Sequence, residues 1–210
     1  SYLKEGKNCI SVRIDNRVLI PIGVNSHSIS DHTQGNWNGI TGDISLRASS
    51  KVYISDIAVF PDLQKKSAKV IVTVVNKEGK EFSGKILLQA AEGGKPDGAR
   101  LAVRKVKAEA KTDRMQVIFE YPMGRRFSTW NEFNPSFYDM NVALKDEKGD
   151  LIDNNSVVFG MREFRTNGTR FEVNGLPVFL RGTTECCIFP LTGYPPSDVA
   201  SWEKVLQTCK

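Results

Sequence analysis

Side chains that can do chemistry gather in a short stretch near the end of the sequence. In "LRGTTECCIFP" (180–190), Glu185, Cys186 and Cys187 directly follow a strand-like segment. A cysteine is activated as a nucleophile by a base beside it, and the sequence brings neither histidine of the chain to this stretch. Cys186 is therefore better interpreted as a small buried hydrophobe than as a catalytic nucleophile.

A long polar loop, 24–42, is the second candidate for chemistry. It carries both histidines, and His32 and Asn36 offer imidazole and amide hydrogen-bonding groups. Trp37 offers a flat ring face suited to a pyranose ring. Long polar loops of this kind are more often functional than merely connecting. The alternative is that Trp37 closes a β-core while the polar side chains bind backbone groups in turns.

Metal and cofactor motifs are not found in the sequence. The cysteines are Cys9, Cys186, Cys187 and Cys209, and their spacing fits neither a disulfide framework nor a CxxC zinc pattern. Acidic residues are scattered and form no calcium-loop pattern, and no glycine-rich phosphate loop follows a strand. We therefore expect free thiols, no metal and no cofactor.

Composition excludes two classes of partner. The chain has 210 residues, of which 40% are hydrophobic, and a formal net charge of +5. The densest basic run, 99–111, interleaves no aromatic residue that could stack on bases, so no nucleic-acid partner is expected. No apolar run approaches the roughly 18 to 20 residues of a membrane-spanning helix, so no membrane span is expected.

Strand-length apolar or alternating segments recur through most of the chain. They are 9–14, 43–48, 52–60, 68–75, 84–90, 115–121 and 138–146. Gly79 and Gly149 stand between such segments, in turns that favour positive φ. This spacing predicts a mainly β fold with a β-sandwich at its centre.

The pattern changes after Arg162. Asn167-Gly168 and Asn174-Gly175 predict two hairpin turns, and the strand-like "VFLRGT" follows them.

A helix is expected at the end of the chain. Pro196 supplies a start signal for a helix over 197–209, and Val199, Trp202 and Leu206 follow at helical spacing. A strand followed by such a helix is the first step of a β/α unit. We therefore expect the beginning of a further domain here.

Four pieces of the chain, in the same order, resemble motifs of glycoside hydrolase family 2, which includes β-galactosidases, β-glucuronidases and β-mannosidases. They are "LKEGKNCISVRIDN", "NWNGITGDISL", "TWNEFNPSFYDMNVAL" and "FGMREFRTNGTRFEVNGLPVFLRGT". The first two look like late strands of the N-terminal jelly-roll domain. The third resembles a segment of the immunoglobulin-like second domain, and the fourth resembles the junction into the catalytic TIM barrel.

This resemblance implies three parts. Residues 1–48 would be the C-terminal part of a jelly-roll sugar-binding domain, 49–162 an immunoglobulin-like β-sandwich, and 163–210 the truncated start of a (β/α)8 catalytic barrel. Retaining glycosidases need two carboxylates about 5 Å apart, and in this family both are glutamates from later barrel strands. The chain would then be an accessory section of an enzyme that cleaves β-glycosidic bonds, without catalytic residues of its own.

The resemblance also implies substrate contacts after the first barrel strand. Family members often have Asn and His there, whereas this chain has Thr184 near the Asn position and Cys186 near the His position. That departure weakens any transfer of β-galactosidase specificity. Glu185 can accept hydrogen bonds from sugar hydroxyls, and the alternative is a structural ion pair with Arg181.

The loop 24–42 would reach towards the barrel mouth, as the equivalent jelly-roll loop does in related enzymes. Some of those enzymes have an acidic residue shortly before the closing strand. Thr33 stands at that position here, although Asp31 is close. The expected substrate-binding residues are thus Glu185, Cys186, Asp31, His32, Asn36 and Trp37.

Glu132 in "WNEF" imitates the Asn-Glu pair that marks the acid/base residue in related barrels. It precedes "NPSFY" in the sandwich pattern, so we interpret it as structural, with Trp130, Pro135 and Tyr138 packing the sandwich.

Three functional hypotheses are kept. The chain is an accessory section of an exo-acting glycosidase, a non-catalytic carbohydrate-binding or scaffolding module, or an adhesion sandwich. The β/α start favours the first, with carbohydrate as the partner of the full-length protein. Exposed truncated elements invite homo-oligomers, and the resemblance implies a bacterial periplasmic or secreted location.

Overall fold

The computed structural model divides the chain into two compact units, Ser1–Leu46 with Arg181–Lys210, and Arg47–Leu180. The residues that the structure describes are 3–15, 17, 22–26, 32, 39–40, 42, 44–93, 104–110, 113–184, 189 and 191–209, with only the backbone described for 104–110. Each unit is described by itself.

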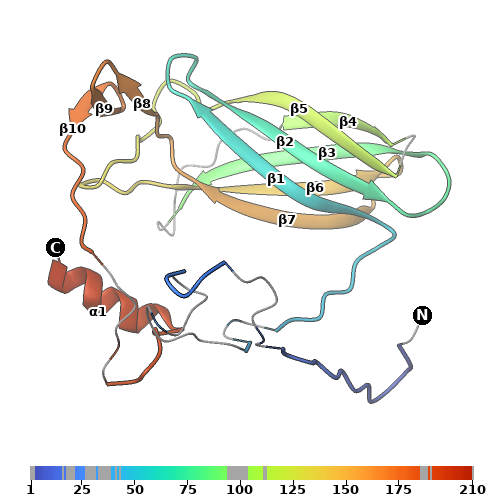
Figure 1. Cartoon of the computed structure of the whole chain (residues 1–210). Coiled ribbons are helices and arrows are strands. Elements are labelled where there is room, and N and C mark those ends of the chain that lie inside the picture. Colours follow the sequence, from blue (N-terminus) through green and yellow to red (C-terminus); the bar gives the residue numbers. More distant parts are fainter. Residues whose placement is uncertain are drawn as a thin grey trace. The chain divides into compact units, whose positions relative to one another are not determined.

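The unit Arg47–Leu180 contains a sandwich of two antiparallel sheets (Figure 1). One sheet has the strand order β1-β2-β5 and the other β4-β3-β6-β7. The strands are β1 (Val52–Asp62), β2 (Ser67–Asn76), β3 (Phe82–Glu92), β4 (Arg104–Ala110), β5 (Arg114–Pro122), β6 (Tyr138–Asp146) and β7 (Leu151–Phe159). The predicted strands from 52 to 146 are therefore confirmed.

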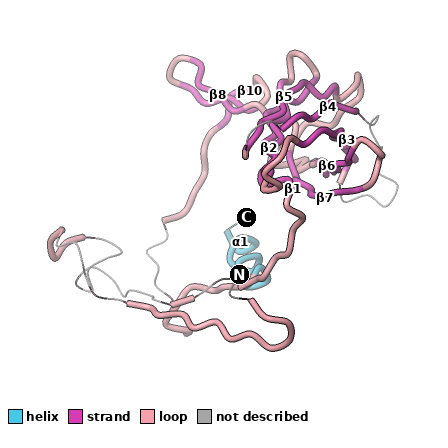
Figure 2. Tube along the Cα trace, turned by 90° about the vertical axis from the view of Figure 1, so that its right-hand side faces the viewer, coloured by secondary structure: helices cyan, strands magenta, loops and turns pink. Residues whose placement is uncertain are grey.

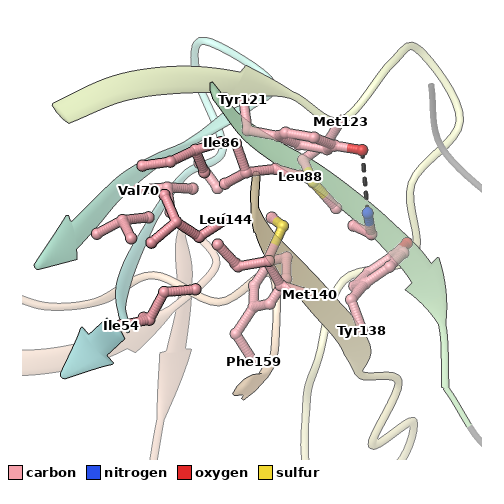
Figure 3. Packing of buried hydrophobic residues seen from close by; sticks show 14 of the residues in the cluster. Ile54, Val70, Ile86, Leu88, Tyr121, Met123, Tyr138, Met140, Leu144 and Phe159 are labelled. Carbon is pink, nitrogen blue, oxygen red and sulfur yellow. Dashed lines mark hydrogen bonds between the residues drawn. The ribbon is translucent and has the colours of Figure 1, made fainter. Parts of the chain in front are cut away.

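The core lies between the two sheets because alternate side chains of each strand point inwards. On β2, Val70, Val72 and Val74 are fully buried, and they belong to one apolar cluster with Leu88 and Leu144 of the other sheet. Figure 3 labels Val70, Leu88 and Leu144 in this cluster. β-Branched residues suit such strands because their restricted rotamers pack well on a pleated surface.

Two buried tyrosines end in satisfied hydroxyl groups. The Tyr121 hydroxyl accepts a hydrogen bond from the Ala90 backbone N–H at 3.0 Å, which links β5 to β3 across the sandwich (Figure 3). The Tyr138 hydroxyl, at the start of β6, accepts one from the Ser128 N–H at 2.8 Å. A tyrosine at this position that bonds back to the preceding connection is a feature of immunoglobulin-like sandwiches.

Asp153 connects the edges of the two sheets by a hydrogen bond. The β1–β2 register shifts between Ile54 and Asp56, which marks a bulge. The Ile54 N–H there donates to Asp153 Oδ2 of β7 at 2.7 Å. Because β1 and β7 are edge strands of different sheets, this bond closes one side of the sandwich.

A third, small antiparallel sheet follows at one end of the sandwich (Figure 2). It consists of β8 (Phe164–Asn167), β9 (Arg170–Val173) and β10 (Leu176–Val178). The second expected turn is confirmed, since Asn174 and Gly175 have φ of 54° and 79°, as a type I′ turn requires. The first turn lies one residue later than expected, because Asn167 pairs with Arg170 and the loop is Gly168-Thr169.

In the other unit, α1 (Val199–Cys209) confirms the expected helix. Asp198 caps it, since its carboxylate accepts from the Ser201 N–H and hydroxyl at 2.8 Å each. Trp202 contacts Phe189 edge-on, with ring centroids 6.1 Å apart. Val199 and Leu206 are exposed. No helix among the described residues is long and apolar enough to cross a membrane.

Three expected strands are not found. Of the expected strand "VFLRGT" (178–183) only Val178 lies in a strand, β10, and 179–183 are irregular. Residues 9–14 and 44–48 are irregular, and their apolar side chains Ile10, Val12, Ile14, Ile44 and Leu46 are exposed. Alternation creates a strand only where a partner strand satisfies its backbone groups, and the described part of this unit offers none. Cys9 and Cys209 are free thiols, as expected.

Tyr121→Phe is expected to destabilise the sandwich by about 1–3 kcal/mol, because it leaves the buried Ala90 N–H without its acceptor. Equilibrium unfolding in urea measures the change. Tyr53→Phe is the matched control, since Tyr53 is only half-buried. An equal loss in both variants would mean that the Tyr121 bond has no special role.

Candidate functional site

The substrate-binding residues expected from the sequence fall mostly outside the described part of the chain. Glu185, Cys186, Asp31, Asn36 and Trp37 all lie there, so their roles stay predictions. His32 is described and its side chain is exposed. No group of three or more His, Cys, Asp or Glu side chains that could hold a metal occurs among the described residues.

Glu132 lies in a closed surface loop. The backbone N–H and C=O groups of Asn131 and Asn134 bond reciprocally at 3.0 and 3.2 Å, and Trp130 bridges to Pro135. Glu132 and the neighbouring Phe133 are exposed at the tip. Of the three residues expected to pack the sandwich, Tyr138 is buried and Trp130 half-buried, but Pro135 is exposed. Pro135 instead closes the loop.

The clearest polar constellation in the described residues joins this loop to the small sheet. We call it the junction cluster and define it as Trp130, Arg162, Glu163 and Asn174. The Asn174 side chain donates from Nδ2 to the Trp130 carbonyl at 2.9 Å and accepts at Oδ1 from the Glu163 N–H at 3.0 Å. The Asn174 N–H donates to the Glu163 carbonyl at 2.9 Å. One turn residue thus fixes three backbone groups of two other segments.

Trp130 contacts the residues that directly follow β7. The Trp130 backbone N–H donates to the Met161 carbonyl at 3.0 Å, and the Arg162 guanidinium carbon lies 4.6 Å from the centroid of the Trp130 ring. A Cβ on Gly160 would lie only 3.0 Å from the Trp130 Cβ, so glycine allows the close approach. Such a cation–π contact at an exposed arginine contributes about 0.5–1 kcal/mol.

One face of the small sheet carries a buried carboxylate. Glu172 is buried, and its two oxygens accept from Asn167 Nδ2 at 2.7 Å and from Arg165 Nε at 2.9 Å. These hydrogen bonds, that of Asn167 first, lower the pKa of Glu172 below its ordinary value, and the carboxylate raises the pKa of Arg165. An anion with both oxygens bound is a structural group and not a poised acid or base.

Sequence reasoning found the turn at Asn174-Gly175 but missed what the Asn174 side chain does. The Asn-Gly pair announces only the backbone conformation. The partners Trp130 and Glu163 are 44 and 11 residues away in the chain, and no local pattern links them. The junction cluster positions the small sheet, because the polar atoms of Asn174 are hydrogen-bonded to backbone groups of Trp130 and Glu163.

The fold and the junction cluster define a class of protein. It is an antiparallel β-sandwich followed by a small three-stranded sheet that is hydrogen-bonded to the preceding loop. The chain belongs to the family described as "Glycosyl hydrolases family 2", whose sequence pattern matches residues 52–162. The resemblance seen in the sequence motifs is thereby confirmed.

Two curated relatives illustrate the membership. The β-galactosidase of Thermoanaerobacter pseudethanolicus is 29% identical over 199 residues, covering 91% of this chain and 25% of that enzyme. A putative β-glucuronidase of Formosa agariphila is 29% identical over 190 residues, covering 87% of this chain and 21% of that protein. The chain thus spans a quarter or less of the length of these relatives.

A solved structure shares the fold. Bacteroides uniformis β-glucuronidase 2, covalently bound to cyclophellitol-6-carboxylate aziridine, superposes with a TM-score of 0.55 at 18% identity, covering 75% of this chain and 20% of that one. At this identity the likeness concerns the fold.

Asn174→Gly is expected to destabilise the unit by about 1–2 kcal/mol, because glycine keeps the positive φ and the backbone bond to Glu163 but removes the two side-chain hydrogen bonds to Trp130 and Glu163. Urea unfolding measures it. Lys66→Gly is the matched control, because Lys66 has the same φ of 54° and is exposed. A loss of the same size in Lys66→Gly would assign the effect to the backbone and not to the Asn174 side chain.

Glu172→Gln tests the buried carboxylate through pH. A lowered folded-state pKa contributes stability above the unfolded pKa, about 4.3, and this contribution is lost as pH falls through the folded pKa. The wild type should therefore be more stable than the variant at pH 7, and the difference should shrink on acidification. Thermal unfolding of both proteins, from pH 7 down to below the unfolded pKa, measures the difference in stability. A difference that stays constant with pH would contradict hydrogen bonds to a charged carboxylate.

Proposed function

We propose that this chain is the accessory, sugar-binding and sandwich section of a family 2 β-glycosidase. The observation that carries the proposal is the family match over 52–162, together with the coverage of the two relatives, of whose length this chain matches 25% and 21%. The relatives are named as a β-galactosidase and a β-glucuronidase, so a β-linked glycoside is the substrate class that we assign to the full-length protein.

The finer architecture belongs to the same proposal. We assign 1–48 to the end of a jelly-roll domain, 49–162 to an immunoglobulin-like sandwich and 163–210 to the start of a (β/α)8 barrel. The buried Tyr138, whose hydroxyl binds back to Ser128, supports the immunoglobulin-like assignment. The helix α1, which follows β10 along the chain, supports the β/α assignment.

Catalysis is assigned to glutamates outside this chain. A retaining mechanism uses one carboxylate as nucleophile and a second as acid and then base, about 5 Å apart. Glu132, the carboxylate whose sequence context imitates such a residue, is exposed in a surface loop. We therefore expect the chain alone to be inactive.

Sugar contacts are assigned to the two polar stretches identified from the sequence. Glu185 and Cys186 would face the substrate from the first barrel strand, and Asp31, His32, Asn36 and Trp37 from the jelly-roll loop. A periplasmic or secreted location follows from the same resemblance.

The second candidate is a non-catalytic carbohydrate-binding or structural module. The exposed side chain of His32 favours this candidate, because a polar loop can bind sugar without a catalytic barrel. The two candidates differ in one respect, which is whether a longer product of the same gene hydrolyses glycosides.

Hydrolysis of a panel of chromogenic β-glycosides by the 210-residue chain, beside the full-length gene product, tests the proposal. We expect activity in the longer protein alone, and the preferred glycoside names the sugar. Activity in neither would favour the binding or structural module. Activity in the 210-residue chain would overturn the assignment of the catalytic glutamates and direct attention to Glu132 and Glu185.

A further inference from the structure

Three lysines lie directly opposite one another across one sheet of the sandwich. In the sheet β4-β3-β6-β7, Lys85 of β3 pairs with Lys107 of β4 on one side and with Lys145 of β6 on the other. The neighbouring Ile86 and Leu144 are fully buried in the core, so the alternation of side chains places the three lysines on the outer face of this sheet. We call Lys107, Lys85 and Lys145 the lysine row.

The lysine row concentrates positive charge on a small area. Like charges directly opposite each other in a sheet are destabilising. Lys85 is exposed and Lys145 is half-buried. The lysines that form ion pairs in the described part of the chain are others, namely Lys65, Lys77 and Lys80. An anion bound at the row would relieve the repulsion between its members.

The register adds a fourth lysine beside the row. Lys105 pairs with Leu87, one step further along the same face. On the outer face of β3, β4 and β6, Glu109 is the one carboxylate that the register places next to these lysines, and it pairs with Ser83. Four positive charges thus stand against one negative charge, which favours a partner that carries several negative charges.

Amide and hydroxyl side chains continue the same face. Asn141 of β6 pairs with Gln89 of β3 and with Ser156 of β7, and Asn154 of β7 pairs with Ala143. Asn141, Asn154 and Ser156 are exposed. Amides and hydroxyls both donate and accept hydrogen bonds, as the hydroxyl groups of a sugar do.

These two features together favour a polysaccharide over a nucleic acid. The register places no aromatic residue on the outer face of β3, β4, β6 and β7, whereas proteins that bind single-stranded nucleic acids stack bases on aromatic side chains. The sulfate or carboxylate groups of an anionic polysaccharide can pair with lysine ammonium groups, and its hydroxyl groups can bind the amides.

We propose that the outer face of β4-β3-β6-β7 binds an anionic polysaccharide, with acidic groups at the lysine row and hydroxyl groups at Asn141, Asn154 and Ser156. The choice of a polysaccharide rests on the proposed carbohydrate function of the chain, but it needs no catalytic residue. Hydrolysis by the full-length protein and binding by the 210-residue chain can therefore fail separately.

Isothermal titration calorimetry of the 210-residue chain at low salt tests the proposal. The probes are dextran sulfate and polygalacturonate, with neutral dextran as the uncharged reference. We expect binding to at least one anionic polymer, which distinguishes sulfate from carboxylate, and the affinity should fall as salt screens the charges. Absence of binding to both anionic polymers, or equal affinity for dextran, would overturn the proposal.

The double variant Lys85→Gln with Lys145→Gln tests the lysine row. The dissociation constant should rise about fivefold, since each exposed ion pair contributes modestly. Lys51→Gln with Lys69→Gln is the matched control, because it removes the same charge from two exposed positions, of which Lys69 lies on the other sheet. An equal loss in both pairs would mean that the net charge of +5 attracts the polymer, and it would overturn the proposal.

Thermal unfolding by circular dichroism shows that each variant folds. The lysine-row variant should be at least as stable as the wild type, because the substitutions remove like charges that face each other. Should it fail to fold, Lys85→Gln alone decides, because Lys85 is exposed.

Asn141→Ala tests the sugar contacts. The dissociation constant for the anionic polysaccharide should rise about threefold, because a hydrogen bond to a sugar hydroxyl is lost. Affinity for a single-stranded DNA of thymidines, measured beside it, should stay the same. Tighter binding to this DNA than to either polysaccharide would overturn the proposal and assign the face to a nucleic acid.

Discussion

Burial of alternate side chains on the facing strands of two sheets is the constraint on which the rest of this structure depends. Val70 and Val72 of β2 and Leu88 of β3 have no exposed surface, and apolar burial of this kind is the dominant favourable term in folding. Because a one-residue slip would turn each of these side chains to solvent, the core fixes the strand register. The register then decides which residues meet at the ends of the strands.

Polar groups complete what the apolar core begins. The hydroxyl of Tyr121 and the carboxylate of Asp153 each accept a hydrogen bond from the backbone of the opposite sheet. Such bonds contribute modestly when made, but a buried donor left without an acceptor is costly. They therefore discriminate between the native arrangement of the sheets and other compact arrangements more strongly than their net energies suggest.

The junction cluster fixes the small sheet β8–β9–β10 next to the sandwich. Asn174 binds the backbone of Trp130 and Glu163, so the small sheet is anchored to the unit by directional bonds. Hydrogen bonds need good geometry to form, and three at one residue leave little freedom of orientation. The anchored sheet therefore sets the direction in which the chain continues after the sandwich.

The sequence by itself determined the mainly β class, the central strands, the type I′ turn at Asn174-Gly175, the helix and, through its motifs, the family. These features depend on local periodicity, turn chemistry and short motifs, all of which are written in neighbouring residues. Tertiary structure decided what depends on distant partners. Residues 9–14 have a strand pattern but no partner strand in the described residues, and they are irregular. Asn174 and Glu172 gained their roles from residues brought together by folding. Hydrogen bonding and burial depend on proximity in space and not on spacing in the chain.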